Sequence, residues 1–452
     1  MRPVVWRTGN EARAFNLPPG ASIDVTEAGD ASAVIVQALT QSGYRARLVS
    51  QPDGSSNATI VTEGLTSQDA ASRHWLVLQA AKHGRRNGSL ILLLQPNRAA
   101  SGLEGLSRTL RKEWPDVDTF AWTIQGDTQA DMGAQIVRAL KQGFGDGILS
   151  TSGALMVPEA GEPLEPPTAH EAVQPAVWLV TGGARGVTAA CAIELARAAG
   201  GTILLAGRSA ETPWTEGLAH AGDLKTLRGS LVEHSRQNGA RVSPAEIDRT
   251  ARALLAGAEI RETLASVRAA GANAVYLPLD AGDAAAVAKT LSSAQHAYGP
   301  ITGLVHGAGV LADRLAADKT EAELRRVFGP KVDGLNNILN SIDVGQLSHV
   351  GFFSSAAAFF GNRGQADYAM ANALLASAGR TLAEDLPAAR VKVFHWGPWA
   401  GGMVDSALAS HFEAQGIPLI PVDEGARIFV NELLGGDRSQ VELVVGEAWA
   451  VA

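Results

Sequence analysis

The 452-residue sequence predicts an α/β protein with two doubly wound parallel sheets. Short apolar runs alternate with segments of helical periodicity along most of the chain, a pattern typical of parallel strands joined by crossover helices. The alternation is interrupted by residues 151–174, which are rich in proline, acid and small residues and lack periodicity. We therefore expect two halves, residues 1–150 and 175–452, joined by a linker.

The composition favours a soluble α/β enzyme and argues against two other classes of protein. The formal net charge of −8 disfavours nucleic acid as a partner, and no apolar run reaches the roughly 20 residues that a membrane-spanning helix needs. The N-terminal sequence lacks the apolar core of a signal peptide. Cys191, the only cysteine, cannot form an internal disulfide and is expected to pack within a helix. These features favour a cytoplasmic protein.

In the first half, five apolar runs are expected to form strands and four periodic segments to form helices. The expected strands are residues 3–8, 45–50, 58–63, 89–95 and 118–124. The expected helices are residues 32–43, 72–84, 102–114 and 133–145. No glycine fingerprint stands at a strand-to-helix turn, so this half looks like a Rossmann-like nucleotide-binding architecture without the nucleotide site.

In the second half the alternation returns with glycine and polar residues at the strand ends. Residues 176–181 are expected to form a strand that leads through a glycine-rich turn into a helix, and residues 202–209 form the next strand. A stretch near 211–265 shows helical patterns and no strand, which predicts a helical insertion. The later expected strands are residues 273–280, 303–310, 350–355, 391–399 and 441–446.

The first turn of the second half has the pattern of a dinucleotide-binding fingerprint. Gly182 and Gly186 take the first two glycine places of T-G-x-x-x-G-x-G, while Thr188 stands at the third. Glycine is needed there because a tight turn brings backbone N–H groups against a pyrophosphate at a helix N-terminus. Arg208 and Ser209 end the next strand, where NAD-specific sites place an acid, and they can instead bind a 2′-phosphate. The expected cofactor is therefore NADPH.

Two further strand ends suit the same cofactor. Asp280 could accept a hydrogen bond from the adenine amine, and the small residues after His306 would let a ribose approach the backbone. The expected cofactor-binding residues are Thr181, Gly182, Arg185, Gly186, Val187, Arg208, Ser209, Asp280, Ala281, Gly307, Ala308, Gly309, Lys331, Tyr368, Gly397 and Pro398.

A second group of polar residues lies between residues 354 and 372. Ser355 ends an apolar run, Tyr368 follows it by thirteen residues, and Asn372 follows the tyrosine by four. A strand would deliver Ser355 at its end, while a helix would place Tyr368 and Asn372 one turn apart on one face. A hydroxyl, a phenol and an amide could then be aimed at one point.

Together with Lys331, these residues resemble the catalytic set of the ketoreductase domains of type I polyketide synthases and polyunsaturated fatty acid synthases. Those domains are a branch of the short-chain dehydrogenase/reductases, most of which use Tyr-x-x-x-Lys with an asparagine on the preceding helix. The synthase ketoreductases exchange the lysine and the asparagine, and so does this sequence. The resemblance covers residues 175–452, and residues 102–117 are similar to the family's catalytically silent, truncated Rossmann-like subdomain.

The resemblance implies NADPH-dependent reduction of a β-ketoacyl thioester, carried by an acyl carrier protein, to a β-hydroxyacyl thioester. The neighbouring synthase domains would be further partners, and no metal is expected. Tyr368 would deliver the proton, and Ser355 would orient the substrate carbonyl. Lys331 would stabilise the phenolate and hold the nicotinamide ribose, and Asn372 would position Lys331.

The substrate entrance is assigned to Leu311, Asp313, Phe360 and Met403. In the related domains a Leu-Asp-Asp motif goes with the D-alcohol, and a tryptophan eight residues before the tyrosine goes with the L-alcohol. This sequence has Leu311-Ala312-Asp313 at the first place and Phe360 at the second. The resemblance therefore implies the D (3R) product.

Two other classes of function stay open. The chain could be a free-standing reductase that acts on a small diffusible carbonyl compound, or a non-catalytic scaffold remnant. The large silent first half disfavours the free-standing reductase. The presence of Lys331, Ser355 and Tyr368 disfavours the remnant.

Overall fold

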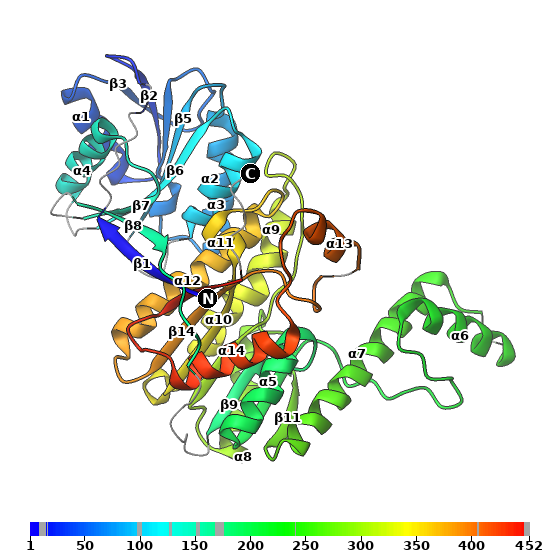
Figure 1. The fold of residues 1–452 in the computed structure, drawn as a ribbon. Coiled ribbons are helices and arrows are strands. Elements are labelled where there is room, and N and C mark those ends of the chain that lie inside the picture. The colour runs from blue at the N-terminus through cyan, green and yellow to red at the C-terminus, as the bar shows by residue number, and fades with distance from the viewer. Residues whose placement is uncertain are drawn as a thin grey trace.

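The computed structural model of the chain describes residues 1–8, 15, 17–96, 102–125, 129–150, 154–167, 176–239, 241–404 and 406–446. In these parts of the chain the strands form one sheet in the order β11-β10-β9-β12-β13-β14-β15-β1-β8-β7-β6-β5-β4-β2-β3 (Figure 1). The predicted α/β class is confirmed, and the two predicted sheets are joined edge to edge into a single one.

The N-terminal half is a parallel sheet with helices on both faces. Its strands are β2 (Ser22–Thr26), β3 (Arg45–Val49), β4 (Ala58–Val61), β5 (Leu90–Pro96), β6 (Asp118–Ile124) and β7 (Gly147–Leu149). One face carries α1 (Asp30–Gln41) and α4 (Gln129–Gln142). The other carries α2 (Ala70–Gly84) and α3 (Leu103–Glu113), and η1 (Glu63–Leu65) connects β4 to α2. The sequence reasoning predicted neither β2 nor β7.

The C-terminal half continues the sheet with seven parallel strands: β9 (Val177–Thr181), β10 (Thr202–Gly207), β11 (Asn273–Pro278), β12 (Gly303–His306), β13 (His349–Ser355), β14 (Arg390–Trp396) and β15 (Glu442–Val445). The helices against one face are α5 (Gly186–Ala199), α14 (Val422–Gly435) and the end of α7 (Pro244–Ala269). Those against the other face are α8 (Ala284–Tyr298), α10 (Gly334–Leu339) and α12 (Ala366–Asp385).

The remaining elements of this half are α9 (Glu321–Phe328), η2 (Gly329–Asp333), η3 (Val344–Gln346), α11 (Ala356–Phe360) and α13 (Ser406–Ala414). The strand order reverses between β9 and β12, and open α/β sheets bind ligands at the carboxyl ends of the strands beside such a reversal. The predicted cofactor turn follows β9 and lies at this point.

Two strands join the halves. β1 (Arg2–Thr8) pairs antiparallel with β15 at Arg2↔Val444 and with β8 (Leu155–Ala160) at Val4↔Ala160. β8 lies inside the segment 151–174 that the sequence predicts to be a linker, so part of this segment is a strand. Residues 151–153 and 168–174 lie outside the described residues.

The two halves also share an apolar core, since α2 and α3 pack against α9 and α12. Leu106 and Leu110 of α3 belong to the same buried cluster as Phe328 of α9 and Met370 and Leu374 of α12. The glycines of α3 allow close approach, because a Cβ at Gly105 would lie 2.5 Å from the carbonyl oxygen of Ala369.

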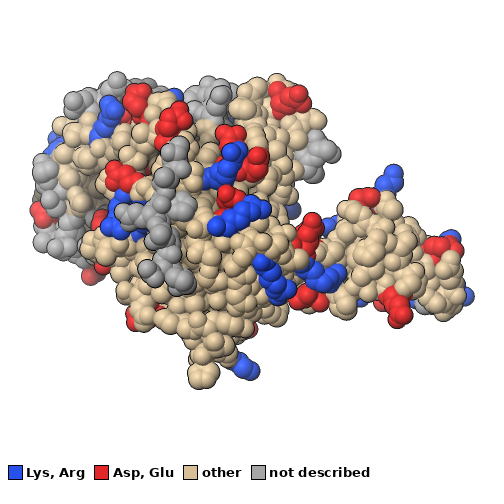
Figure 2. All heavy atoms as spheres, turned by 60° about the horizontal axis from the view of Figure 1, so that its bottom comes forward, with Lys and Arg blue, Asp and Glu red and all other residues tan. Residues whose placement is uncertain are grey.

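The region near 211–265, which is expected to be helical, holds α6 (Leu224–Gln237) and most of α7. Figure 1 shows these helices projecting from the body of the molecule, and Figure 2 shows side chains of both charges mixed on the projection. The projection has its own small core around Leu227, Ile247 and Leu254. Among the described residues, no helix is both long and apolar enough to cross a membrane.

Candidate active site

Lys331 lies in η2, a π-helical turn between α9 and α10. π-helical turns are frequent at functional sites, and Pro330 favours the irregularity because it lacks the backbone N–H that a regular helix uses. The Lys331 side chain is buried, and its Nζ donates to the carbonyl oxygen of Phe353 at 2.8 Å. Nζ also lies 5.8 Å from the ring centroid of Tyr368. Burial lowers the pKa of Lys331 to about 7.

Ser355 is the last residue of β13 and the N-cap of α11. Its Oγ accepts a hydrogen bond from the backbone N–H of Ala357 at 3.1 Å, so the hydroxyl proton can still be donated. Tyr368 lies in the first turn of α12. Burial raises the pKa of Tyr368, and hydrogen bonding to Asn372 and Ser355 offsets part of this effect. The phenol therefore stays protonated at neutral pH.

Asn372 lies one turn after Tyr368 on α12 and is fully buried. Its Nδ2 donates to the main-chain oxygen of Tyr368 at 2.8 Å. Its Oδ1 is buried and has no hydrogen-bond partner among the described residues. Because a buried acceptor without a partner is costly, this atom is suited to a donor that a bound molecule or water would bring.

Two adjoining cavities lie along the carboxyl ends of β9, β10, β11 and β12. The larger, of about 560 Å³, is lined by Lys331, Ser355 and Tyr368 together with the glycine turn after β9. The smaller, of about 180 Å³, is lined by Arg208, Ser209, Asp280 and Ala281. The two cavities share Gly182, Arg185, Ala308 and Gly309. Each of the sixteen expected cofactor-binding residues lines one cavity or both.

Together, the two adjoining cavities form a trough that fits an extended dinucleotide. Gly182 has a φ of +71°, and a Cβ there would lie 3.0 Å from the backbone of Gly307, so glycine is required. Thr188, which stands at the third glycine place of the fingerprint, is accommodated by Gly307. A Cβ at Gly307 would lie 2.6 Å from Cγ2 of Thr188. The helix has a threonine where the fingerprint has its third glycine, and the space for this larger side chain comes from Gly307, which follows the end of the neighbouring strand β12.

His306 connects the cofactor turn to the lysine, and the sequence reasoning gave its side chain no role. Its Nε2 donates to the main-chain oxygen of Lys331 at 2.9 Å, and its Nδ1 accepts from Oγ1 of Thr181 at 2.9 Å. Burial and the nearby Lys331 charge lower the pKa of His306 to about 3, so the ring is neutral as these two bonds require. Thr181 in turn accepts from the N–H of Ala308 at 3.3 Å.

The insertion helix α7 also reaches the site. Glu259 lines the larger cavity and forms an ion pair with Arg185 of the cofactor turn. Four residues later, Oγ1 of Thr263 donates to the carbonyl oxygen of Ala184 at 2.9 Å. No local signal in the sequence identifies Glu259, because it lies 74 residues from its partner along the chain.

Two of the four residues assigned to the substrate entrance line the larger cavity and two do not. Leu311 and Met403 are part of its wall. Asp313 accepts a hydrogen bond from Nε2 of Gln365 at 3.0 Å, and Gln365 itself lines the cavity. Phe360 does not line the cavity; its ring packs edge-on against Phe359 at a centroid distance of 4.9 Å.

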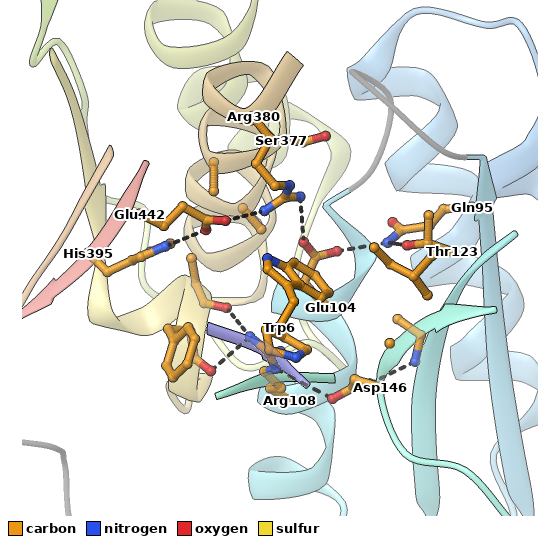
Figure 3. Close-up of a pocket in the computed structure, with 18 of the residues that line it drawn as sticks. Trp6, Gln95, Glu104, Arg108, Thr123, Asp146, Ser377, Arg380, His395 and Glu442 are labelled. Carbon is orange, nitrogen blue, oxygen red and sulfur yellow. Dashed lines mark hydrogen bonds and ion pairs between the residues drawn. The ribbon is translucent and has the colours of Figure 1, made fainter. Parts of the chain in front are cut away.

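A polar network lies between the two halves (Figure 3). Arg380 of α12 pairs with Glu442 of β15 at 2.8 Å and with Glu104 of α3 at 3.9 Å. Glu442 also accepts from Nε2 of His395 at 2.9 Å. Burial alone would raise the pKa of Glu442, but Arg380 and His395 lower it to about 2.

This network extends to the catalytic residues through Ser354. The Oγ of Ser354 donates to the main-chain oxygen of Asn372 at 3.0 Å and also contacts Nδ1 of His395 at 3.1 Å. Ser354 immediately precedes Ser355 on β13. Ser354 therefore ties the end of β13 and the main chain of α12 to His395, whereas Glu104 reaches these residues only through its longer, 3.9 Å contact with Arg380.

The comparisons with known proteins agree with this geometry. The family model of the KR domain matches residues 176–401. The chain is 34% identical over 364 residues to a polyunsaturated fatty acid synthase of Thraustochytrium sp., and the match covers 76% of this chain and 12% of that protein. It is 28% identical over 346 residues to a phenolphthiocerol/phthiocerol polyketide synthase of Mycobacterium tuberculosis, and this match covers 75% of this chain and 16% of that protein. The chain thus spans a small part of the length of these relatives.

Solved structures share the fold over almost the whole chain. The ketoreductase from the first module of phoslactomycin biosynthesis in Streptomyces sp. HK803 matches with a TM-score of 0.71 and 21% identity, covering 98% of this chain and 92% of that one. A ketoreductase domain from the bacillaene assembly line matches with a TM-score of 0.68 and 21% identity, covering 98% and 95%. Since the family model spans half of the chain and includes the glycine turn and the serine, tyrosine and lysine, the chain belongs to the KR domain family, the ketoreductase domains of polyketide and polyunsaturated fatty acid synthases.

Proposed function

We propose that the chain reduces the β-keto group of a β-ketoacyl thioester, carried by an acyl carrier protein, to a β-hydroxyacyl thioester with NADPH. The observation that carries the proposal is the convergence of Lys331, Ser355 and Tyr368 on one cavity that adjoins the glycine turn. A scaffold remnant would have no need to keep all three groups on the wall of the same cavity.

NADPH would lie along the two cavities and would supply a hydride when bound. The glycine turn after β9 would hold its pyrophosphate, and Arg208 and Ser209, which line the smaller cavity, would hold its 2′-phosphate. Arg208 is exposed, so it is free to meet a charged group arriving from solvent. Gly397 and Pro398 line the larger cavity and would border the nicotinamide.

The protein's own groups account for the proton and for the orientation of the carbonyl. Ser355 would donate a hydrogen bond, but not its proton, to the substrate oxygen and would stabilise the negative charge that develops there. Tyr368 would deliver a proton to the same oxygen, since its raised pKa keeps the phenol protonated. Lys331 would stabilise the phenolate that remains. Asn372, to which the resemblance assigns the positioning of Lys331, donates to the main chain of Tyr368 and would hold that residue in place.

NADPH oxidation measured against a panel of β-ketoacyl thioesters tests the reaction. We expect NADPH to be strongly preferred over NADH, and we expect Arg208→Asp to reduce that preference by removing a cation and adding an anion. Arg236→Asp, a matched change at an exposed position on α6, should leave the preference unchanged. Equal efficiency with both cofactors in the parent chain would contradict the assignment of Arg208.

The same panel tests the substrate class. A thioester presented on a carrier protein should be reduced more efficiently than the same acyl group on a small thiol. Small diffusible ketones reduced just as well would instead favour the free-standing reductase. With an α-unsubstituted substrate we propose the D (3R) product, supported by Asp313, which accepts a hydrogen bond from Gln365 of the cavity wall. Chiral chromatography of the released hydroxy acid decides this point.

The N-terminal half, residues 1–150, is proposed to be a structural subdomain that binds no nucleotide. No glycine fingerprint stands at its strand-to-helix turns. Its α2 and α3 instead use their apolar residues against α9 and α12 of the catalytic half.

A further inference from the structure

Glu113, the last residue of α3, contacts two separate segments of the catalytic half. Its Oε2 accepts a hydrogen bond from the backbone N–H of Ala316 at 2.7 Å, and its Oε1 accepts from the backbone N–H of Gly364 at 2.8 Å. These two residues lie 203 and 251 positions further along the chain. One carboxylate from the N-terminal half thus bridges two backbone segments of the other half.

Both segments contribute residues to the wall of the larger cavity. The first runs through Leu311, which lines the cavity, to Ala316, and the second contains Asn362 and Gln365, which also line it. The segments are bonded to each other as well, since the N–H of Arg314 donates to the carbonyl oxygen of Gly364 at 2.8 Å. Glu113 therefore holds the outer side of a unit that forms one wall of the substrate entrance.

The inner side of this unit is held by a buried lysine beside the catalytic tyrosine. Nζ of Lys319 donates to the carbonyl oxygen of Ala312 at 2.6 Å and to Oδ1 of Asp367 at 2.9 Å. The same Oδ1 accepts from the backbone N–H of Tyr368 at 2.9 Å. Lys319 and Asp367 are both fully buried. A movement of the entrance segments would therefore be passed to the start of α12 and to Tyr368.

A carboxylate is the group that this bridge requires. The N–H groups of Ala316 and Gly364 belong to buried residues, and a buried N–H without an acceptor is unfavourable. A carboxylate offers an acceptor on each oxygen, whereas an amide offers one acceptor and one donor, and the donor would face an N–H. Gly364 has a φ of +82°, which glycine adopts without strain, so its N–H can be turned toward Glu113 at no steric cost.

The helix that carries Glu113 is itself fixed to the catalytic half. Nη1 of Arg108 donates to the carbonyl oxygens of Phe359 at 2.8 Å and Ala358 at 3.1 Å, at the end of α11. Oγ1 of Thr109 accepts from the N–H of Asn362 at 3.3 Å. The carboxylate is thus presented from a rigid base.

We propose that Glu113 is a positioning residue of the reductase: through its two hydrogen bonds the N-terminal half sets the shape of the substrate entrance and hence the face of the carbonyl that is reduced. This inference rests on the proposed function. It assigns the otherwise silent half a part in stereochemical control as well as in stability.

The test compares Glu113→Gln with two control variants in the full chain. Asp116→Asn removes the same charge three residues later, from an exposed side chain near Arg85. Glu104→Gln weakens the contact between the halves at Arg380, at the opposite end of α3 from Glu113. For each protein we would measure kcat, KM, the ratio of hydroxyacyl enantiomers, the Kd for NADPH, and hydrogen exchange at the amides of residues 312–316 and 362–365.

In Glu113→Gln we expect faster exchange at Ala316 and Gly364 and an unchanged Kd for NADPH. We expect kcat/KM for the thioester to fall about tenfold, because small misplacements of a bound substrate are costly, and we expect a lower enantiomeric ratio. Both controls should keep the parental ratio, even if Glu104→Gln lowers the melting temperature. The proposal would be refuted if Glu113→Gln left both kcat/KM and the enantiomeric ratio unchanged. It would also be refuted if Glu104→Gln lowered the enantiomeric ratio as much as Glu113→Gln does.

The outcomes separate this inference from the proposed function. If the parent chain reduces the thioester and Glu113→Gln behaves like the parent, the positioning role is wrong and the reductase function stands. If the parent chain does not reduce any β-ketoacyl thioester, the proposed function fails. The exchange measurement then decides by itself whether Glu113 holds the two segments, since unchanged exchange would refute the bridge.

Discussion

Lys331→Met is expected to make the cofactor-free protein more stable while abolishing its activity. The Lys331 side chain is buried in η2, and burial lowers its pKa from 10.5 to about 7. The lysine keeps its ordinary pKa in the unfolded chain. Folding must therefore either remove its proton or bury its charge, and both cost free energy. Methionine has a similar length and carries no charge to desolvate.

The size of the effect follows from the lowered pKa. Each pKa unit corresponds to about 1.4 kcal/mol, so the lowering amounts to about 5 kcal/mol when the lysine is protonated in both states. Methionine loses the hydrogen bond to the Phe353 carbonyl, which is worth about 1 kcal/mol. The variant should therefore gain about 2–4 kcal/mol below pH 7, allowing for relaxation around the charge.

The pH dependence gives the sharper test. Between pH 7 and 10.5 the unfolded parent binds more protons than the folded parent, so the parent's stability rises with pH across this window. The advantage of Lys331→Met is therefore full below pH 7 and fades as the pH rises toward 10.5. Lys289→Met, on the exposed face of α8, should show no such trend.

Urea unfolding of the three proteins at several pH values would measure these differences. The reasoning is refuted if Lys331→Met is no more stable than the parent at pH 6, or if its advantage stays constant up to pH 10.

Two further predictions concern residues of α12. Tyr368→Phe should cut reduction by well over tenfold, more than about 1.4 kcal/mol of barrier, while fluorescence titration shows NADPH still binding; a variant above a tenth of the parental rate would mean that another group donates the proton. Arg380→Met should lower the free energy of unfolding by about 3 kcal/mol, because it leaves the buried carboxylate of Glu442 without its main cation; urea unfolding measures this, and a loss under about 1 kcal/mol would show that His395 compensates.

Much of the fold could be predicted from the sequence because apolar periodicity is a local property. The strand and turn around Gly182, for example, are encoded within about ten neighbouring residues. β2 was missed because Asp24 stands in its middle and breaks the apolar pattern. The structure satisfies this buried carboxylate with Ser56 at 2.8 Å and Arg47 at 2.7 Å, partners from other segments of the chain.

The sequence reasoning also missed the joining of the two sheets, because this joining depends on pairing between distant segments of the chain. β1 pairs with β15 across nearly the whole length of the chain, and β8 contains Pro158 and Glu159, which are unusual in a strand. A local pattern cannot report a pairing between distant segments. The sequence therefore indicated the two halves, whereas the pairing of the strands that join them is visible only in the structure.

The same distinction applies to the candidate site. The expected cofactor-binding and catalytic residues stand at strand ends or at fixed spacing, and the structure brings the expected cofactor-binding residues to two adjoining cavities. Glu259 and Glu113 reach the site from an insertion and from the other half. Their roles depend on tertiary packing, and neither belongs to a motif.

The position of α12 connects the N-terminal half to the proposed active site. α12 carries Tyr368 to the wall of the larger cavity, and elsewhere on its surface it packs against α3. There, Cβ atoms at Gly102 and Gly105 would collide with Leu374 and with the backbone of Ala369. Tyr368, the proposed proton donor, is therefore placed by a helix held between both halves. Removing the N-terminal half would expose an apolar face of α12 and also free Tyr368 to move.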